Sequence, residues 1–512
     1  MTHAILKGAP LLVVGAGIMG TGIAQVAAQS GHRVLLFDTR AGAAQQAATR
    51  LGATLDGLVA KGKLGADAAQ TIRSRIEPVA ALEEVGSVSL VVEAIVENLD
   101  AKRALFQQLE ALVPAGCLLA TNTSSISVTA IANGLQHPGR LVGMHFFNPV
   151  PLMGLVEVVS GLHTEAAVAE TIFELSRAWG KTPVHARSTP GFIVNRIARP
   201  YYAEALALLH EQAATPRVID ACLRAAGFRM GPCELMDLIG HDTNFAVTQS
   251  VYTANFNDRR YMPSPVQREM VEGGLLGRKS GRGFYRYPEG VPPLATAVYE
   301  ALPPAHEVAV HGDDWIAERL EQAATAALAA QGRSLRRVRD SGWTGLAIDA
   351  ARLVLTDGRS ASARATVLGT PDLALFDRPL TASAPTATAL AYALAEGSAE
   401  PWRHQASAWL AALGFAPLRL PDAPGLVVAR TVAMLINEAA DAVQQGVCTP
   451  EGADTAMKLG VNYPAGPFEW LQSWSVAGVI GVLDALDEHY RGERYRVSPW
   501  LRRRRDALTA PG

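Results

Sequence analysis

LLVVGAGIMG, residues 11–20, is the stretch that decides the fold of the first part of the chain. Its four apolar residues predict a buried strand, which is followed by a GxGxxG turn, Gly15-Ala16-Gly17-Ile18-Met19-Gly20. The small, Ala-rich run over 21–30 predicts a helix that packs closely on a sheet, and RVLLFD predicts a second strand that ends at Asp38. Strand, glycine turn, helix, strand and acid together predict a dinucleotide-binding Rossmann unit.

The glycines and the acid have separate tasks in such a unit. Gly15 permits the tight turn, Gly17 lets the backbone approach a pyrophosphate, and Gly20 lets the helix meet the strand, while the helix N-terminus faces the phosphates. Asp38 lies 23 residues after Gly15 (38 − 15), where a carboxylate binds the ribose hydroxyls and repels a 2′-phosphate. This predicts NAD over NADP. Arg40 argues the other way, because NADP enzymes hold that phosphate with a nearby Arg.

Residues 41–82 predict two amphipathic helices. Lys61 and Lys63 lie between them, in VAKGKL. These two cations are either solvated charges at helix ends or a phosphate-facing patch, and the residues alone leave both interpretations open.

Two more buried strands are predicted at 87–93 and 117–120. Glu97 and Ser124 follow their carboxyl ends, where open parallel sheets bind ligands. The hydroxyl-rich TNTSS cluster around Ser124 fits a helix N-cap as well as a binding site. Both interpretations stay open, and one does not exclude the other.

The stretch GMHFFNPVPLMGLVEVV, residues 143–159, holds a His and a Glu that we interpret as one catalytic pair. His145 ends a short apolar run, and Glu157 lies in a second strand-like run, LVEVV. Strands joined by a Pro-rich connection can lie side by side, so that Glu157 accepts Nδ1–H and leaves Nε2 free to take a proton. A lone His beside a strand is often structural, so the assignment depends on the rest of the chain.

Strand–helix alternation ends near residue 188, and helices alone are predicted after it. TPGFIVNR, residues 189–196, opens a long helix whose apolar residues recur every three or four positions through Leu209. Further helices follow up to GRKSGRGFY, residues 277–285, and the Pro-rich residues after it predict a linker.

A second alternating region begins at Glu307, but its first turn lacks the glycine pattern. The turn reads HGDDW, residues 311–315, and carboxylates at a helix N-terminus repel a phosphate. We therefore expect no second nucleotide here.

An internal repeat follows this region. APGLVVAR at 423–430 matches TPGFIVNR at 189–196 with an offset of 234 (425 − 191), and Glu438 matches Glu204 at the same offset. The helical domain is therefore expected twice. Ala429 stands where the first copy has Asn195, so the function of Asn195 is not repeated.

Composition narrows the class of protein. With 49% hydrophobic and 18% charged residues, the chain is neither disordered nor membrane-embedded, and a net charge of −2 offers no field that recruits nucleic acid. Four Cys without ligand spacing argue for a reducing compartment and against disulfides or zinc. We expect a cytoplasmic protein with no membrane or nucleic-acid partner and no metal.

The expected fold is an α/β Rossmann domain followed by an all-α domain, then a reduced Rossmann-like segment and a second all-α domain. The predicted boundaries are 1–188 for the NAD-binding domain, 189–287 for the first helical domain, 288–304 for the linker, 305–420 for the reduced Rossmann-like domain and 421–512 for the second helical domain.

The chain resembles the short-chain L-3-hydroxyacyl-CoA dehydrogenases. The resemblance rests on GAGIMG, VEAIVEN, NTSS, HFFNPVP, LVEVV, PGFIVNR and GRKSGRGFY, which occur in the family's order over residues 11–287. The further arrangement is similar to the fused bacterial enzymes of phenylacetate degradation, which oxidise 3-hydroxyadipyl-CoA. The resemblance implies NAD-dependent oxidation of a (3S)-3-hydroxyacyl-CoA to a 3-oxoacyl-CoA.

The resemblance also implies roles for individual residues. His145 becomes the general base at the C3 hydroxyl, and Glu157 orients it. Ser124 and Asn195 correspond to polar residues around the reacting oxygen and thioester, and Ser124 is expected to contact NAD and CoA as well. Positions near the cofactor or in the same pocket are Glu97, Lys102, Asn148 and Lys279, and loosely matched CoA-facing positions are Lys61 and Lys63.

Alternatives remain at this point. The substrate could instead be 3-hydroxybutyryl-CoA, which differs from the adipyl ester at the far end of the acyl chain. A distal carboxylate would need a basic partner in the cleft, and the sequence does not rank the candidates Arg196, Arg199 and Arg278. A remoter alternative is a non-catalytic NAD-binding protein. Single-copy members of the family dimerise through the helical domain, so the chain could form a homodimer, or its second copy could pack on the first.

Overall fold

The computed structural model describes residues 6, 8–294, 302–329, 332–381 and 388–509. The chain divides into two compact units, residues 1–196 with 445–461, and residues 197–444 with 462–512. Residues 295–301 of the predicted linker lie outside the described residues. Within the described part of the chain, no helix is both long and apolar enough to cross a bilayer.

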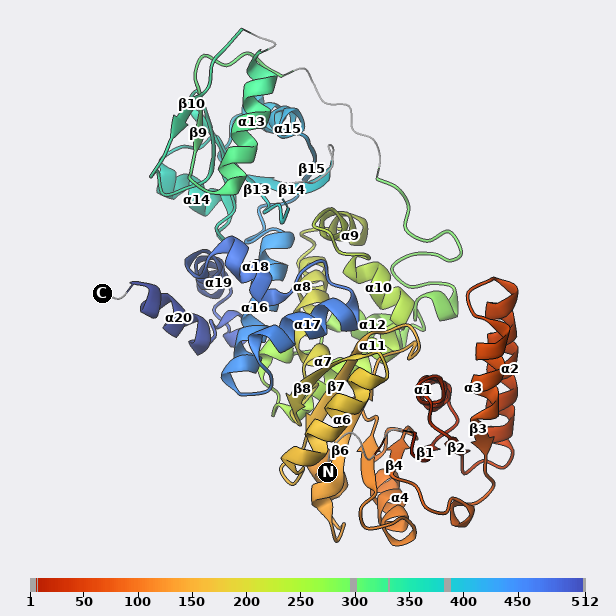
Figure 1. The fold of residues 1–512 in the computed structure, drawn as a ribbon. Helices are drawn as coiled ribbons and strands as arrows, with labels where there is room; N and C mark the ends of the chain where they lie inside the picture. The colour runs from red at the N-terminus through yellow and green to blue at the C-terminus, as the bar shows by residue number, and fades with distance from the viewer. Residues whose placement is uncertain (1–5, 7, 295–301, 330–331, 382–387, 510–512) are drawn as a thin grey trace. The chain divides into compact units, whose positions relative to one another are not determined.

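The first unit is built on an eight-stranded sheet with the order β3-β2-β1-β4-β5-β6-β7-β8 (Figure 1). Neighbouring strands are parallel except β6 and β7, which are antiparallel. β1, β2, β4 and β5 are buried along their whole length, as expected of strands covered on both faces. The strands are β1 (Leu11–Val14), β2 (Val34–Phe37), β3 (Ile76–Pro78), β4 (Leu90–Glu93), β5 (Leu118–Thr121), β6 (Leu141–Phe146), β7 (Leu155–Ser160) and β8 (Thr182–Arg187).

Helices cover this sheet. α1, α2, α3 and α6 share one hydrophobic core with the strands, and Figure 1 shows α2 and α3 side by side next to β3. The helices of this unit are α1 (Ile18–Gln29), α2 (Ala43–Ala60), α3 (Ala66–Ser74), η2 (Leu82–Glu84), α4 (Leu99–Leu112), α5 (Val128–Ala132), η3 (Pro138–Arg140), α6 (Ala166–Ala178), α7 (Val194–Ile197, at the unit boundary) and α17 (Pro450–Val461).

The second unit has a seven-stranded sheet with the order β10-β9-β11-β12-β13-β14-β15. It mixes parallel and antiparallel pairs, so it departs from an all-parallel Rossmann sheet. The strands are β9 (Val308–His311), β10 (Arg336–Val338), β11 (Gly345–Ile348), β12 (Ala351–Leu355), β13 (Leu373–Phe376), β14 (Thr388–Leu394) and β15 (Phe415–Arg419).

The helices of the second unit fall into two groups, those of the helical repeats and those that pack on the seven-stranded sheet. They are α8 (Arg199–His210), α9 (Pro216–Ala225), α10 (Pro232–Ile239), α11 (His241–Ala254), η4 (Arg259–Tyr261), α12 (Pro265–Glu272), η5 (Arg278–Ser280), α13 (Trp315–Ala329), α14 (Ala361–Leu368), α15 (Glu400–Ala412), α16 (Val428–Gln444), α18 (Pro467–Trp474), α19 (Val476–Tyr490), η6 (Glu493–Tyr495) and α20 (Pro499–Thr509). Among these, α13, α14 and α15 belong with the seven-stranded sheet.

The single long helix predicted from Thr189 through Leu209 was wrong, because two helices, α7 and α8, occupy this stretch. Pro200 explains the break, since proline has no N–H to donate and is tolerated only in the first turn of a helix. It lies there in α8. At the matching position of the repeat stands Met434 (200 + 234), and α16 runs through it without interruption.

Buried ion pairs join the two helical copies. Glu204 of the first copy is fully buried and accepts hydrogen bonds from Arg494 Nη2 at 2.8 Å and from the Tyr495 hydroxyl at 3.0 Å. Arg430 Nε adds a third contact at 3.0 Å. A buried carboxylate is tolerated only with such partners, so these contacts hold the copies in one register.

The reciprocal contact is also present. Glu438 of the second copy accepts the Tyr261 hydroxyl at 2.7 Å and lies 3.5 Å from Arg260 Nη1. The offset of 234 relates Glu204 to Glu438 and Arg260-Tyr261 to residues 494–495. The same side chains therefore meet twice with the copies exchanged, which is the pattern of a two-fold interface.

Candidate active site

His145 and Glu157 face each other across two antiparallel strands. β6 and β7 place them directly opposite in the register, so both side chains lie on one face of the sheet. His145 Nδ1 lies 2.6 Å from Glu157 Oε2. Both side chains are buried. The contact predicted from the two strand-like runs is confirmed.

The second oxygen of Glu157 is held by backbone amides. Glu157 Oε1 accepts the amides of Ile193 at 3.1 Å and Val194 at 2.9 Å, at the start of α7. As a carboxylate, Glu157 can only accept hydrogen bonds. Nδ1 of His145 is therefore the donor, and Nε2 is left to accept a proton.

Asn195 and Ser124 are brought together next to this pair. Asn195 follows Val194 in α7, and its Nδ2 donates to the backbone carbonyl of Ser124 at 3.4 Å. Ser124 lies just beyond the carboxyl end of β5. The arrangement links the helix that holds Glu157 to the loop in which a ligand was predicted.

Glu97 organises that loop. Its Oε1 accepts the Ser124 amide at 2.9 Å and the hydroxyls of Thr123 at 2.7 Å and Ser125 at 3.0 Å. Burial raises the pKa of Glu97, but the charge of Lys102 and these hydrogen bonds outweigh it, so its pKa lies below the ordinary value. Glu97 is therefore a structural anion that orients the Ser124 loop.

Lys102 is deeply buried in α4 and serves two carboxylates. Its Nζ lies 2.6 Å from Glu93 Oε1 and 3.3 Å from Glu97 Oε2. Glu93 also accepts the Thr121 hydroxyl at 2.7 Å. Sequence reasoning missed Glu93 as a site residue. An acid that ends a buried strand nine residues before a lysine (102 − 93) was the available signal.

The glycine turn has the geometry that a pyrophosphate needs. A Cβ at Gly15, where φ is +106°, would lie 2.4 Å from the Ala94 carbonyl oxygen, and a Cβ at Gly20 would lie 1.8 Å from the Gly15 carbonyl oxygen. A Cβ at Gly17 would meet no atom within 4 Å. Gly17 is the N-cap of α1 and makes no side-chain cap, so the amides of the first turn point outward.

Asp38 lines the cavity at this turn. The cavity measures about 610 Å³ and its lining includes Gly15, Gly17, Asp38 and Arg40. Asp38 Oδ2 accepts the Ala16 amide at 2.9 Å, and Oδ1 accepts Arg40 Nε at 3.0 Å. Burial raises the pKa of Asp38, but its bonds with Arg40 and Ala16 outweigh it and the pKa lies below the ordinary value. The residues present fit NAD, with Arg40 engaged by Asp38.

Of the remaining predicted residues, three lie in exposed parts of the first unit and one lies in the second unit. Asn148 is exposed in the loop after β6, and Lys61 and Lys63 are exposed in the turn between α2 and α3. Lys279 lies in the second unit, on η5, where it pairs with Asp242. The structure therefore brings together His145, Glu157, Asn195 and Ser124 within the first unit.

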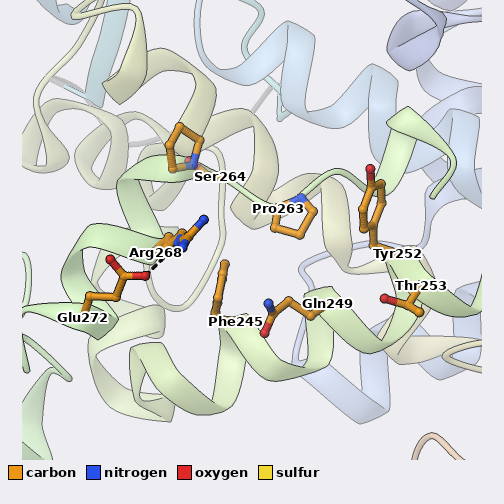
Figure 2. Close-up of a pocket in the computed structure, with 9 residues that line it drawn as sticks. Phe245, Gln249, Tyr252, Thr253, Pro263, Ser264, Arg268 and Glu272 are labelled. Carbon is orange, nitrogen blue, oxygen red and sulfur yellow. Dashed lines mark hydrogen bonds and ion pairs between the residues drawn. The ribbon is translucent and has the colours of Figure 1, made fainter.

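A second hollow of about 610 Å³ lies in the first helical repeat between α11 and α12 (Figure 2). Its lining includes Phe245, Tyr252, Pro263, Arg268 and Glu272. Arg268 and Glu272 form an ion pair at 2.7 Å, so the cation of this hollow is already matched by an acid. The residues that line this hollow include no His–carboxylate pair, and we assign the hollow no chemistry.

A Rossmann glycine turn combined with a carboxylate-backed His on a strand of the same sheet is the arrangement of an NAD-dependent dehydrogenase. The chain belongs to the 3-hydroxyacyl-CoA dehydrogenase family: the NAD-binding domain model of that family matches residues 11–189, and its C-terminal domain model matches residues 191–287 and again 425–510. A 3-hydroxybutyryl-CoA dehydrogenase reduced Rossmann-fold domain model matches residues 353–424. The predicted fold class and its duplication are confirmed.

Similar proteins extend over the whole chain. It is 44% identical to the 3-hydroxyadipyl-CoA dehydrogenase of Escherichia coli K12 over 96% of both chains. A crystal structure named 3-hydroxybutyryl-CoA dehydrogenase from Escherichia coli K12 matches with a TM-score of 0.86 and 42% identity over 98% of both chains. The 3-hydroxybutyryl-CoA dehydrogenase of Clostridioides difficile is 40% identical and covers 54% of this chain and 99% of its own. The chain is accordingly an NAD-dependent oxidoreductase of this family, as the resemblance implied.

Proposed function

We propose that the protein oxidises a (3S)-3-hydroxyacyl-CoA at C3 with His145 as the general base and Glu157 as the group that orients it. The observation that carries this proposal is the 2.6 Å contact between His145 Nδ1 and Glu157 Oε2. Because Nδ1 donates to the carboxylate, Nε2 takes the proton of the C3 hydroxyl as the carbonyl forms. The imidazolium that results lies beside a fixed anion, which stabilises it.

The Gly15–Gly20 turn would hold NAD⁺, which when bound would accept the hydride that leaves C3. The first-turn amides of α1 would bind its pyrophosphate, and Asp38 would bind the ribose hydroxyls. Ser124 and Asn195 bind the reacting oxygen and the thioester, which explains why Glu97 and Lys102 fix the Ser124 loop so tightly. Asn148, Lys279, Lys61 and Lys63 remain predicted contacts of cofactor or CoA.

We propose 3-hydroxyadipyl-CoA as the acyl substrate. The full-length relative at 44% identity bears that substrate in its name, whereas the solved structure at 42% identity is named for the butyryl ester. Each Arg considered for the distal carboxylate has a partner in the chain. Arg196 donates to Gln445 Oε1 at 2.8 Å, Arg199 donates to Thr248 Oγ1 at 3.2 Å, and Arg278 lies 3.5 Å from Glu234. Arg278 is the most exposed of the three, so it can exchange its partner most cheaply.

The test compares initial rates of NADH formation with 3-hydroxyadipyl-CoA and 3-hydroxybutyryl-CoA. A kcat/KM at least about tenfold higher for the dicarboxyl ester, corresponding to about 1.4 kcal/mol, supports the adipyl substrate. A preference for the butyryl ester overturns it and leaves the dehydrogenase assignment intact. No NADH formation with either ester would favour a non-catalytic NAD-binding protein.

We also propose that the second helical copy takes the place of a partner subunit. The reciprocal contacts of Glu204 and Glu438, both buried, support this, because a two-fold set of contacts closes within one chain. Size-exclusion chromatography with light scattering should then give the mass of a single chain. The mass of two chains would contradict the proposal and restore the homodimer.

A further inference from the structure

One helix of the second helical copy lies against the catalytic strands. α17 (Pro450–Val461) belongs to the first compact unit, although α16 and α18 belong to the second. It packs on β7 and β8, the last two strands of the sheet. β7 carries Glu157. The second copy therefore supplies one element to the unit that holds the His145–Glu157 pair.

The approach is close at Gly460, a buried residue near the end of α17. A Cβ on Gly460 would lie 2.7 Å from Leu155 Cδ2 and 3.0 Å from Val194 Cγ2. It would lie 3.7 Å from Phe147 Cε1. Interiors are close-packed, so even one added methyl group must displace a neighbour here.

Each of these neighbours is coupled to the His145–Glu157 pair. The Val194 amide donates to Glu157 Oε1 at 2.9 Å, and the centroids of the Phe147 and His145 rings are 4.5 Å apart. Leu155 lies two residues before Glu157 on β7, so the two side chains share a face. A displacement at Gly460 thus reaches both members of the pair.

The segment that leads into α17 is fastened to the same two supports. Val447 accepts the Arg187 amide at 2.9 Å, at the end of the edge strand β8. Gln445 Oε1 accepts Nη1 of Arg196 at 2.8 Å, and Arg196 is buried in α7. α7 also supplies the Val194 amide to Glu157. α17 is therefore held against both the strand and the helix that fix the carboxylate.

We propose that Gly460 is a positioning residue for the dehydrogenase reaction, because its missing side chain sets how closely α17 presses Val194 and Phe147 onto the Glu157–His145 pair. The inference rests on the proposed roles of His145 and Glu157. The second helical copy has Ala429 in place of Asn195 and so lacks that polar side chain. The inference gives this copy an indirect part in catalysis, through the packing of α17.

The test uses the full chain with Gly460→Val and, as a matched control in the first turn of the same helix, Gly452→Ala. At Gly452 a Cβ would come no closer than 3.3 Å to Thr449 Oγ1. We expect Gly460→Val to lower kcat at least about tenfold, because a misplacement of about 1 Å costs up to 10²-fold, with the Kd for NADH and the KM within about twofold. Gly452→Ala should leave all three unchanged.

A double-mutant cycle separates positioning from general damage to the fold. In a Glu157→Gln background, Gly460→Val should cost less than about twofold in kcat, because the contact that it disturbs is already lost. An equal loss in both backgrounds, or a kcat within twofold of wild type in Gly460→Val alone, overturns the inference. If Gly460→Val does not fold, Gly460→Ala is put through the same cycle, and a loss of about threefold confined to the Glu157 background decides it.

Failure of the proposed function has its own signature. Wild-type protein that forms no NADH from either 3-hydroxyacyl-CoA ester overturns the function and this inference together. Active wild-type protein that is indifferent to Gly460→Val overturns the inference alone.

Discussion

The two carboxylate oxygens of Glu157 have different partners: one contacts His145, and the other contacts the start of α7. Its Oε2 lies 2.6 Å from His145 Nδ1, and its Oε1 accepts two backbone amides. The backbone amides hold the carboxylate in place, and the carboxylate in turn orients the imidazole. Strand pairing and the start of α7, which are features of the fold, determine which nitrogen of His145 donates to the carboxylate.

The first prediction concerns His145→Gln. Loss of the base should lower kcat by about 10²- to 10⁴-fold, the range for one positioned acid–base group. The Kd for NADH, measured by fluorescence, should stay within about twofold of the wild-type value, since the Gly15–Gly20 turn is untouched. A kcat within tenfold of wild type would remove His145 from the mechanism.

The second prediction separates cofactor binding from folding at Gly17. Gly17→Val should lower the Tm by no more than a few degrees, because a Cβ there meets no protein atom within 4 Å and the main cost is a poorer N-cap. It should raise the Kd for NADH at least about tenfold by blocking the approach of the pyrophosphate. Gly15→Ala is the contrasting variant, since its Cβ would lie 2.4 Å from the Ala94 carbonyl oxygen and the Tm should fall. Unchanged NADH binding in Gly17→Val would contradict the assigned site.

The third prediction concerns cofactor choice at Asp38. Asp38→Ala removes the carboxylate that repels a 2′-phosphate and releases Arg40, whose Nε now lies 3.0 Å from Asp38 Oδ1. The ratio of kcat/KM for NADP to that for NAD should rise at least about tenfold. Asp38→Ala/Arg40→Ala is the control and should lose most of that gain. An unchanged ratio in the single variant would show that neither side chain selects the cofactor.

The fourth prediction concerns the pH dependence of stability at Glu204. Burial raises the pKa of Glu204, but Arg494 and Arg430 outweigh it, so its folded-state pKa lies below the ordinary value. Its contribution is therefore complete above the unfolded pKa of about 4.3 and is lost as pH falls through the folded pKa. Glu204→Gln should lower the free energy of unfolding by about 3–5 kcal/mol at pH 7, because it leaves buried guanidinium groups unpaired.

Denaturant unfolding from pH 7 to pH 3 tests this. The difference between wild type and Glu204→Gln should be constant down to about pH 4.5 and shrink below it. Glu488→Gln, on an exposed part of α19, is the control and should change stability by less than about 0.5 kcal/mol. A difference that does not depend on pH would mean that the Glu204 charge is not what stabilises the interface.

The sequence predicted what local pattern determines. Four buried strands and the glycine turn followed from apolar runs and spacing, and the His145–Glu157 contact followed from two strand-like runs joined by prolines. The break at Pro200 was also a local signal, but the continuous apolar periodicity outweighed it in our interpretation. The domain boundaries stay predictions.

Tertiary contacts between distant segments could not be predicted in the same way. Arg260 and Glu438 are 178 residues apart (438 − 260), and neither lies in a recognisable motif. The repeat offset does relate Arg260 to Arg494, but an offset shows that two positions are equivalent and does not show what they touch. The role of Gly460 could not be recognised from the sequence either, because the need for a glycine comes from Leu155 and Val194, which pack on it from elsewhere in the chain.

The reciprocal Glu204–Arg494 and Glu438–Arg260 contacts join two halves that peptide bonds already connect. For separate subunits such an interface depends on protein concentration, and dilution dissolves it. Here the two copies are parts of one chain, so the interface forms within a single molecule and dilution does not separate them. If the second copy takes the place of a partner subunit, as proposed, kcat per molecule should be the same at picomolar as at micromolar protein.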